Sequence, residues 1–231
     1  SIAGMAVAFP LGVGISLVLG TVVNYIGAPK GDPVILFSGI ALIVIAIVCN
    51  GIASGKVESS KKNNSGKGIV LALVAGTLMA FFYRFVAAAM DLDNFASPQA
   101  GKVTPYTAIV IFSLGVLASN FIFNTLVMKK PFVGEPVTYS QYFKGSFKTH
   151  LVGILGGAIW CLGTAFSYIA SGKAGAAISY ALGQGAPLIA AVWGVFIWKE
   201  FKGADRVTNI LLVAMFALFI AGLVCIIISG N

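Results

Sequence analysis

The chain has 231 residues, of which 58% are hydrophobic and only 10% carry a charge. A soluble domain carries about 25% charged residues, so this chain lacks the polar groups needed to cover a water-exposed surface. The composition excludes a soluble enzyme, a disordered region and a disulfide scaffold. The net charge of +8 matters through its distribution along a membrane protein, and we expect no nucleic acid as a partner.

Seven long stretches are almost free of charge and alternate with polar connectors. Six of them contain no Asp, Glu, Lys, Arg or His, and the third contains one charge, Arg84. About 20 continuous apolar residues cross the ~30 Å hydrocarbon core of a bilayer as a helix. We therefore predict an all-α integral membrane protein with seven transmembrane helices, over residues 1–29, 33–54, 68–90, 103–128, 151–172, 174–198 and 207–231.

The basic residues of the connectors fall mainly on one side. The other side receives only Lys30, Lys102 and Lys173. Because short cytoplasmic loops carry an excess of Lys and Arg, we expect the richer side to be cytoplasmic and the protein to lie in the plasma (inner) membrane. Ser171 to Lys173 predict a tight turn and an antiparallel hairpin of the fifth and sixth spans. The richer side has Lys56, Lys61, Lys62, Lys67, Lys129, Lys130, Lys144, Lys148, Lys199, Lys202 and Arg206.

The first two predicted spans resemble the last two. Residues 8–11 match residues 185–188 around a proline, and residues 41–49 match 217–225 at four positions with one fixed offset. Because the first and sixth spans are five helices apart, the two copies run in opposite directions through the bilayer. Inverted repeats of this kind are typical of secondary transporters, with the substrate site at the repeat interface.

The repeat predicts a ten-helix protein of two five-helix halves, from which three helices at the front are missing. The sequence begins at Ser1 without an initiator methionine, so we interpret it as an N-terminally truncated fragment. Residues 1–55 would be the last two helices of the N-terminal repeat. Residues 56–67 would be a cytoplasmic linker, and residues 68–231 a complete five-helix C-terminal repeat.

Aromatic and polar residues share one face on each of two neighbouring spans. Trp160, Thr164 and Tyr168 are spaced i, i+4 and i+8, and Tyr180 and Gln184 are spaced i and i+4. Aromatic surfaces with a few hydrogen-bonding groups suit a planar polar solute or a sugar ring. The same residue types also pack helices together and mark membrane interfaces. We predict all five as substrate-binding residues.

Arg84 is the only charge inside a predicted span, where a charge normally faces a cavity or a partner. It lies six residues before Met90, so its side chain either holds a solute or reaches the membrane interface. We include it among the substrate-binding residues. Pro10 and Pro187 each remove a backbone hydrogen bond within a span. We predict both as hinges, with a static kink as the alternative.

Three motifs carry a resemblance to a known family: GGAIW (156–160), IASGKAG (169–175) and SYALGQGAPLIAAVWGVFIWKEF (179–201). They are similar to the C-terminal hairpin of the ureide permease family, and residues 5–30 also resemble it. The family is related to bacterial glucose/ribose and rhamnose porters within the drug/metabolite transporter superfamily. The resemblance implies a ten-helix fold of two repeats and proton-coupled uptake (symport) of small polar solutes such as ureides and nucleobases.

The chain departs from the family in its centre. Plant members have a long central cytoplasmic region with a nucleotide-binding-like motif, which here shrinks to residues 56–67. Gly66 and Lys67 lack the second glycine and the following Ser or Thr of a phosphate-binding loop. We therefore expect neither ATP nor another cofactor.

These features predict a secondary active transporter, not an enzyme, that moves a nucleobase, ureide or sugar across the bilayer by alternating access. The alternatives are a multidrug or metabolite exporter of the same superfamily and a seven-helix receptor-like protein. The single histidine, His150, has no catalytic partner at motif spacing, and no His, Cys and Asp set predicts a metal site.

The sequence is consistent with three alternatives for coupling of transport to protons. No acidic residue lies inside a predicted span, although proton coupling usually uses an intramembrane carboxylate or histidine. The carrier lies in the missing helices, or Asp91 or Glu200 reaches inward from a helix end, or transport is not coupled to protons.

Overall fold

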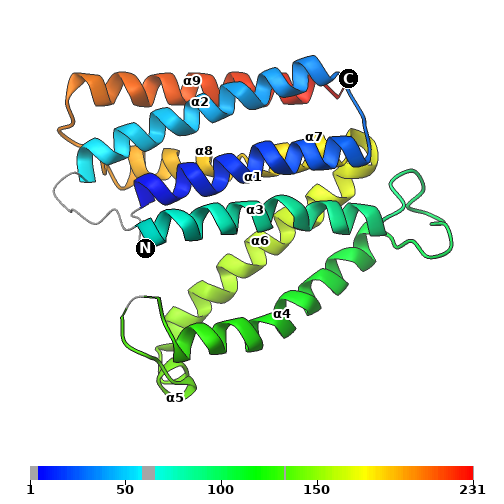
Figure 1. Ribbon diagram of the computed structural model, residues 1–231, viewed down its shortest axis with the longest axis horizontal. Coiled ribbons are helices and arrows are strands. Elements are labelled where there is room, and N and C mark those ends of the chain that lie inside the picture. The colour runs from blue at the N-terminus through cyan, green and yellow to red at the C-terminus, as the bar shows by residue number, and fades with distance from the viewer. Residues whose placement is uncertain (1–4, 59–65, 133, 231) are drawn as a thin grey trace.

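The computed structural model describes residues 5–58, 66–132 and 134–230, and all regular elements in these ranges are helices (Figure 1). In chain order they are α1 (Met5–Gly27), α2 (Pro33–Glu58), α3 (Gly66–Ala89), α4 (Pro105–Lys129), α5 (Tyr139–Phe143), α6 (Phe147–Ala174), α7 (Ala176–Gly183), α8 (Ala186–Val192), the π-helical η1 (Trp193–Ile197) and α9 (Arg206–Ile228).

Six segments of the described chain are long and apolar enough to cross a bilayer: α2, α3, α4, α6, the run from α7 to η1, and α9. They correspond to the second to seventh predicted spans, which are therefore confirmed as apolar helical segments of membrane-spanning length; the sixth consists of the consecutive elements α7, α8 and η1. α1 is apolar too, but its part Gly12–Gly27 is shorter than a full span. The first predicted span stays a prediction.

Capping side chains determine where several helices begin. The side chain of Thr104 accepts the N–H of Thr107 at the start of α4, and Asp205 accepts the N–H of Thr208 at the start of α9. Such caps satisfy backbone N–H groups that have no partner within the helix.

The predicted tight turn at residues 171–173 is wrong, because α6 continues through these residues to Ala174. The chain reverses instead at Gly175, whose φ of +86° is a conformation that favours glycine. The sixth predicted span is also not one helix. It breaks after Gly183, and a turn at Gln184 and Gly185 precedes α8.

α2 and α9 form a long antiparallel pair that packs backbone to backbone. At one end the N–H of Asp32 donates to the carbonyl of Ser229 over 2.8 Å. In the middle, a Cβ at Gly39 would lie 2.7 Å from the carbonyl oxygen of Gly222, and a Cβ at Gly222 would lie 2.6 Å from that of Gly39. Lipid is as apolar as these side chains, so close packing through small residues stabilises such a pair.

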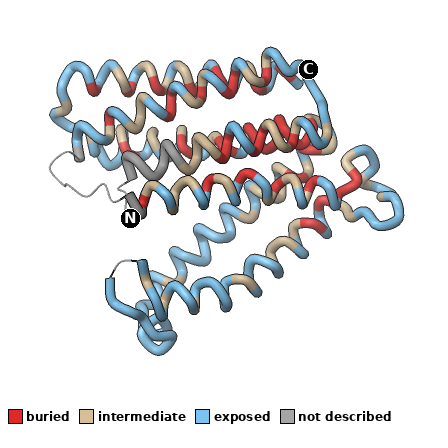
Figure 2. Tube along the Cα trace, viewed as in Figure 1, coloured by how far each residue is buried: buried red, intermediate tan, exposed pale blue. Residues whose placement is uncertain are grey.

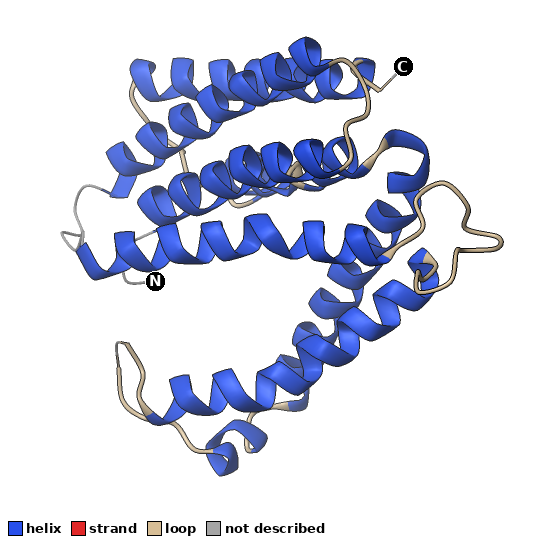
Figure 3. Ribbon diagram, turned by 45° about the vertical axis from the view of Figure 1, so that its right-hand side comes forward, coloured by secondary structure: helices blue, strands red, loops and turns tan. Residues whose placement is uncertain are grey.

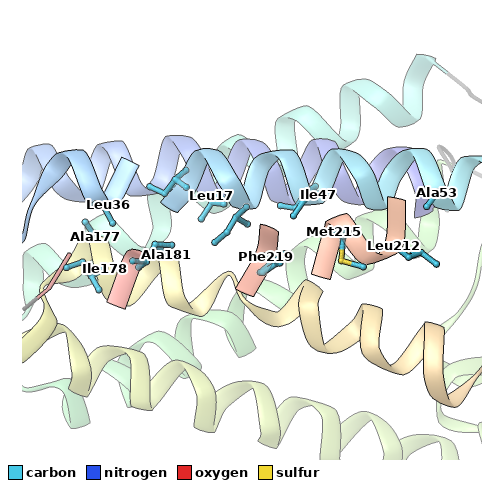
Figure 4. Close-up of a cluster of buried hydrophobic side chains, with 14 residues drawn as sticks. Leu17, Leu36, Ile47, Ala53, Ala177, Ile178, Ala181, Leu212, Met215 and Phe219 are labelled. Carbon is cyan, nitrogen blue, oxygen red and sulfur yellow. The ribbon is translucent and has the colours of Figure 1, made fainter. Parts of the chain in front are cut away.

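The helices form three layers (Figures 1 and 3). The first layer contains α2 and α9, the second α1, α3 and α7–α8, and the third α4 and α6. α1 is central because it contacts α2, α3 and α7. Apolar side chains from four helices fill the space between the first two layers, among them Leu17, Leu36, Ala181 and Phe219 (Figure 4).

The α4–α6 pair diverges from the rest of the bundle toward one end (Figures 1 and 3). Every residue from 151 to 160 of α6 is exposed, on all faces of the helix (Figure 2). Toward the other end α6 is partly covered, with Tyr168 and Ser171 fully buried. The third layer is therefore attached to the second mainly through the C-terminal part of α6.

The charged connectors gather at the two ends of the bundle. At one end Lys30 Nζ donates to the carbonyl of Gly172 over 3.0 Å, and we call this the Lys-poor end. At the other, Lys56 Nζ lies 3.3 Å from the carboxylate of Asp205, and we call this the Lys-rich end. The α4–α6 pair is spread apart from the second layer at the Lys-rich end (Figure 1).

Candidate functional site

Three tyrosines from three helices meet inside the bundle. The ring of Tyr83 in α3 lies 5.4 Å, centre to centre, from Tyr168 in α6 and 5.5 Å from Tyr180 in α7. Each side chain is at most 3% exposed. Rings at these separations and tilted angles attract one another through their edges and faces. The contact therefore joins the second and third layers.

Serine hydroxyls and backbone carbonyls surround the phenol groups. The hydroxyl of Tyr180 donates to the carbonyl of Ser16 in α1 over 2.8 Å and lies 2.6 Å from the Ser16 hydroxyl. The hydroxyl of Tyr83 donates to the carbonyl of Ser167 over 2.9 Å, and Ser167 Oγ donates to the carbonyl of Ser179. We call this set the tyrosine–serine cluster: Ser16, Tyr83, Ser167, Tyr168, Ser179 and Tyr180.

Glycine lets the cluster form at the crossing of α1 and α7. The ring of Tyr180 occupies the space where a side chain at Gly20 would be. Gly20 lies four residues after Ser16, so both are on the same face of α1. The bare backbone at Gly20 therefore brings the Tyr180 hydroxyl within reach of Ser16.

Two hydroxyls of the cluster have no hydrogen-bond partner in the described part of the chain. They belong to Tyr168 and Ser179, and both side chains are almost fully buried. A buried polar group without a partner costs about 1–3 kcal/mol. A solute or water that reached these hydroxyls would satisfy them and recover this cost.

The cluster contains hydroxyl groups, carbonyl oxygens and aromatic rings, and none of its residues is Asp, Glu, His, Lys or Arg. A charged solute would be expensive to bury there without an opposite charge. A neutral planar solute can instead stack on a ring and exchange hydrogen bonds with the hydroxyls.

The predicted aromatic stripe on α6 continues from the cluster toward the Lys-rich end. Phe112 of α4 links its two aromatic residues, with ring centres 6.2 Å from Tyr168 and 6.0 Å from Trp160. Thr164 lies between them and donates its hydroxyl to the carbonyl of Trp160. Trp160 is 50% exposed, so the row of rings runs from an open surface to the buried tyrosines.

Gln184 and Pro187 lie at the break between α7 and α8. Gln184 is buried, its N–H donates to the carbonyls of Tyr180 and Ala181, and its side-chain amide makes no hydrogen bond within the described residues. Pro187 is in the first turn of α8, where a missing N–H costs little. The structure thus brings Gln184 next to the helix break but not into the cluster. The side chain of Pro10 lies outside the described residues.

Arg84 follows Tyr83 in α3 but points elsewhere. Its guanidinium packs against Gly27 in the last turn of α1, and the side chain is half-buried. The C-terminal end of a helix carries partial negative charge, which attracts a cation. The structure separates Arg84 from the tyrosines and sets it near the Lys-poor end.

The sequence analysis missed Ser16, Tyr83 and Ser179. It also missed Thr21 and Asn24 of α1, both fully buried, each with one side-chain oxygen that has no partner among the described residues. A usable signal was present, because these are polar groups within stretches otherwise almost purely apolar. Polar residues in such stretches are costly unless they have a structural or functional partner.

Asp91 is the acidic residue nearest to the cluster along the chain, in the loop after α3. Its carboxylate accepts the N–H groups of Gln99 (2.9 Å), Asn94 and Asp93 (both 3.1 Å). The Gln99 bond first, and then the other two together with Lys102, hold the pKa of the Asp91 carboxyl below its usual range. Asp91 therefore stays ionised and shapes its loop.

Glu200 lies at the Lys-rich end, beyond η1. Its N–H donates to the carbonyl of Gly194 over 3.0 Å, and its carboxylate folds back over the same glycine. In the described ranges, no three His, Cys, Asp or Glu side chains gather where they could hold a metal ion.

The chain is similar to proteins of one known family. The model of the ureide permease family matches residues 56–229. Ureide permease 2 and ureide permease 4 of Arabidopsis thaliana are each 24% identical to this chain over 165 residues, which cover 71% of the chain and 41% of each relative. Ureide permease 1 of the same plant is also 24% identical, with 42% of its length covered.

The chain thus spans about two fifths of the length of these curated relatives. No solved structure matches it. The matched relatives are permeases, which are transporters and not enzymes, and six helices in the described part of the chain have membrane-spanning length and composition. The chain therefore belongs to the ureide permease family and is an integral membrane protein.

Proposed function

We propose that the protein to which this chain belongs is a secondary active transporter that moves a small, uncharged, polar solute by alternating access. The observation that carries the proposal is the tyrosine–serine cluster, where α1, α3, α6 and α7 meet and two buried hydroxyls have no described partner. Ureides are the first candidates because the curated relatives are ureide permeases. Nucleobases and sugars are the other solutes to test.

The architecture we propose is a ten-helix protein of two inverted five-helix repeats. Residues 1–55 are the end of the first repeat, residues 56–67 the linker and residues 68–231 the second repeat. Antiparallel packing of α2 against α9 supports this assignment. So do their entry turns, in which Gly31 and Gly203 have φ near +84° and are followed by the capping residues Asp32 and Asp205.

The broken helix α7–α8 supports a substrate site at mid-membrane. Discontinuous helices in transporters present unwound backbone to substrates and ions. Here the break at Gln184 follows Tyr180 of the cluster by one helical turn. Pro187 after the break, and Pro10 in the matching position of the first repeat, are the hinges in this proposal.

The chemistry of the cluster favours a neutral ring that carries amide groups. Such a ring stacks on an aromatic face, donates its N–H groups to carbonyl oxygens and accepts hydrogen bonds from hydroxyls. Tyr168 and Ser179 supply the hydroxyls, and the ring of Phe112 leads toward Trp160. Thr164 lies on the same path, Gln184 would meet the solute at the helix break next to the cluster, and Arg84 would act where the solute leaves at the Lys-poor end.

In this proposal the Lys-rich end faces the cytoplasm and the membrane is the plasma (inner) membrane. Asp91 does not carry a coupling proton, because a carboxyl whose pKa lies below the usual range stays ionised at physiological pH. Glu200 is the acid of this chain that remains a candidate for proton symport.

Uptake into proteoliposomes by the full-length protein tests the function. Labelled allantoin, uracil and glucose are offered with and without a pH gradient. We expect saturable uptake of at least one neutral solute, which is allantoin if the substrate follows the relatives. No uptake of any of the three, in either gradient, would contradict the proposal.

Tyr168→Phe tests the site, because it keeps the ring and removes a hydroxyl without a described partner. Loss of one hydrogen bond to the solute costs about 1 kcal/mol, which raises KM roughly fivefold, whereas the melting temperature should not fall. Tyr106→Phe makes the same change at an exposed position of α4 and should leave KM unchanged. Equal KM values in both variants would remove Tyr168 from the site.

A further inference from the structure

The loop between α3 and α4 covers the Lys-poor end of the tyrosine–serine cluster. We call residues Met90 to Val103 the cap segment, and its two ends are joined by an isolated β-bridge. Met90 is 2% exposed, and Leu92 and Val103 pack against the apolar cluster that contains the three tyrosines. The cap segment therefore closes this end of the site with apolar side chains.

Phe95 holds the cap segment against the last turn of α6. Its ring atoms lie 2.5 and 2.7 Å from where a Cβ at Gly172 would be, and the carbonyl oxygen of Leu92 lies 3.0 Å from the same point. Lys30 Nζ donates to the carbonyl of Gly172 from the α1 side. Three segments thus converge on one glycine.

The cap segment is internally fixed, so it can move as a unit. The carboxylate of Asp91 accepts three backbone N–H groups from within the loop, and Asn94 accepts the N–H of Ser97. The contacts that join it to α6 are different in kind. They are apolar contacts, of Phe95 and Leu92 with Gly172 and of Leu92 and Val103 with the apolar cluster that contains Tyr168.

At the opposite end, no other described element covers α6. Residues 151–160 of α6 are exposed on every face, and Gly156 has no atom within 4 Å of its would-be Cβ. Gly156 lies four residues before Trp160, on the face that carries the aromatic stripe. Figure 2 shows exposed positions along both α4 and α6 at this end.

We propose that the cap segment is the gate at the Lys-poor end and that the contact of Phe95 with Gly172 closes it in this structure. In the same state the site opens toward the Lys-rich end. This inference rests on the proposed function. Opening the gate requires Phe95 to leave the glycine surface. Gly172 is needed because any Cβ there would displace the Phe95 ring, which weakens the closed state.

Thiol labelling of the full-length protein, with Cys49, Cys161 and Cys225 replaced by alanine, tests the gate without a transport assay. A charged, membrane-impermeant thiosulfonate reagent is applied to either side of oriented vesicles. One reporter is Ala176→Cys, which is buried beneath the cap segment. The other is Gly156→Cys, and Leu162→Cys on the opposite face of α6 is its lipid-facing control.

We expect the reagent to label Gly156→Cys from the Lys-rich side at least tenfold faster than Leu162→Cys. Ala176→Cys should resist the reagent from the Lys-poor side and become reactive at least tenfold faster when Phe95→Ala is added. Gly172→Ala changes the other residue of this contact and should make Ala176→Cys reactive to the same extent. It provides a second test if the Phe95→Ala variant does not fold.

Fast labelling of Ala176→Cys from the Lys-poor side without a gate mutation would overturn the gate, as would continued protection in both gate variants. Equal rates at Gly156→Cys and Leu162→Cys would overturn the open end. The labelling rates do not depend on any solute. A failed uptake assay with the expected labelling pattern would therefore contradict the proposed function and leave the gate geometry standing.

Discussion

Gly222→Ala should separate α2 from α9. These two helices form the most extensive helix–helix contact of the described chain. The added Cβ would lie 2.6 Å from the carbonyl oxygen of Gly39 and equally close to a side-chain carbon of Ile43. A backbone oxygen in a helix cannot rotate away, as the end of a flexible side chain can. The two helices must therefore move apart to accommodate one methyl group.

The size of the effect follows from this geometry. An ordinary Cβ contact begins near 3.4 Å, so the helices must shift by roughly 0.8 Å, and a gap of this size forfeits a quarter to a half of the dispersion energy of the affected contacts. Overpacking of this kind costs about 1–3 kcal/mol. In the longer full-length protein, ~2 kcal/mol lowers the melting temperature by only a few degrees, because the entropy of unfolding grows with chain length.

Thermal unfolding of the full-length protein in detergent, followed by tryptophan fluorescence, measures the loss. Gly115→Ala in α4 is the matched control, because nothing lies within 4 Å of its would-be Cβ and alanine favours a helix over glycine. Gly39→Ala should cost as much as Gly222→Ala, and the double variant less than their sum, because one separation serves both methyl groups. If Gly222→Ala melts no lower than Gly115→Ala, the backbone contact does not hold the two helices together.

Two further variants test the cluster and the cap segment. Tyr180→Phe removes both hydrogen bonds to Ser16 and should cost roughly 1 kcal/mol, as for hydrogen bonds between membrane helices; an unchanged melting temperature would show that these bonds do not stabilise the bundle. Asp91→Asn should lower the melting temperature at neutral pH. Because the folded-state pKa of Asp91 is depressed, its contribution is present above the unfolded pKa of about 4 and is lost as pH falls through the folded value. A difference between the two proteins that does not shrink as the pH falls below the unfolded pKa would refute this origin.

The positions of most helices could be read from the sequence with little error. Long apolar stretches bounded by lysines, prolines and glycines predicted α2, α3, α4, α6 and α9 within a few residues. The physical reason is local, because a backbone in lipid must satisfy its own hydrogen bonds and a helix does so within one segment. The distribution of lysines between alternate connectors follows from the same segmentation.

Part of the candidate site could also be predicted from the sequence. The i, i+4, i+8 spacing placed Trp160, Thr164 and Tyr168 on one face, and that face meets Phe112 of α4. The contact of Tyr83 with Tyr168 could not be predicted from such spacing. Their contact joins positions 85 residues apart in the chain, and helical spacing relates only residues within one helix.

The sequence by itself determined that the chain forms apolar helices for a bilayer, because length, hydropathy and charge are properties of each segment alone. Only the tertiary structure decided which faces meet. Lipid is as apolar as the interior of the bundle, so polarity does not distinguish a packed face from a lipid-facing one. Which backbones come close cannot be derived from the apolar pattern. The structure alone therefore shows the contact of Phe95 with Gly172, the crossing of α2 and α9 at Gly39 and Gly222, and the break at Gln184.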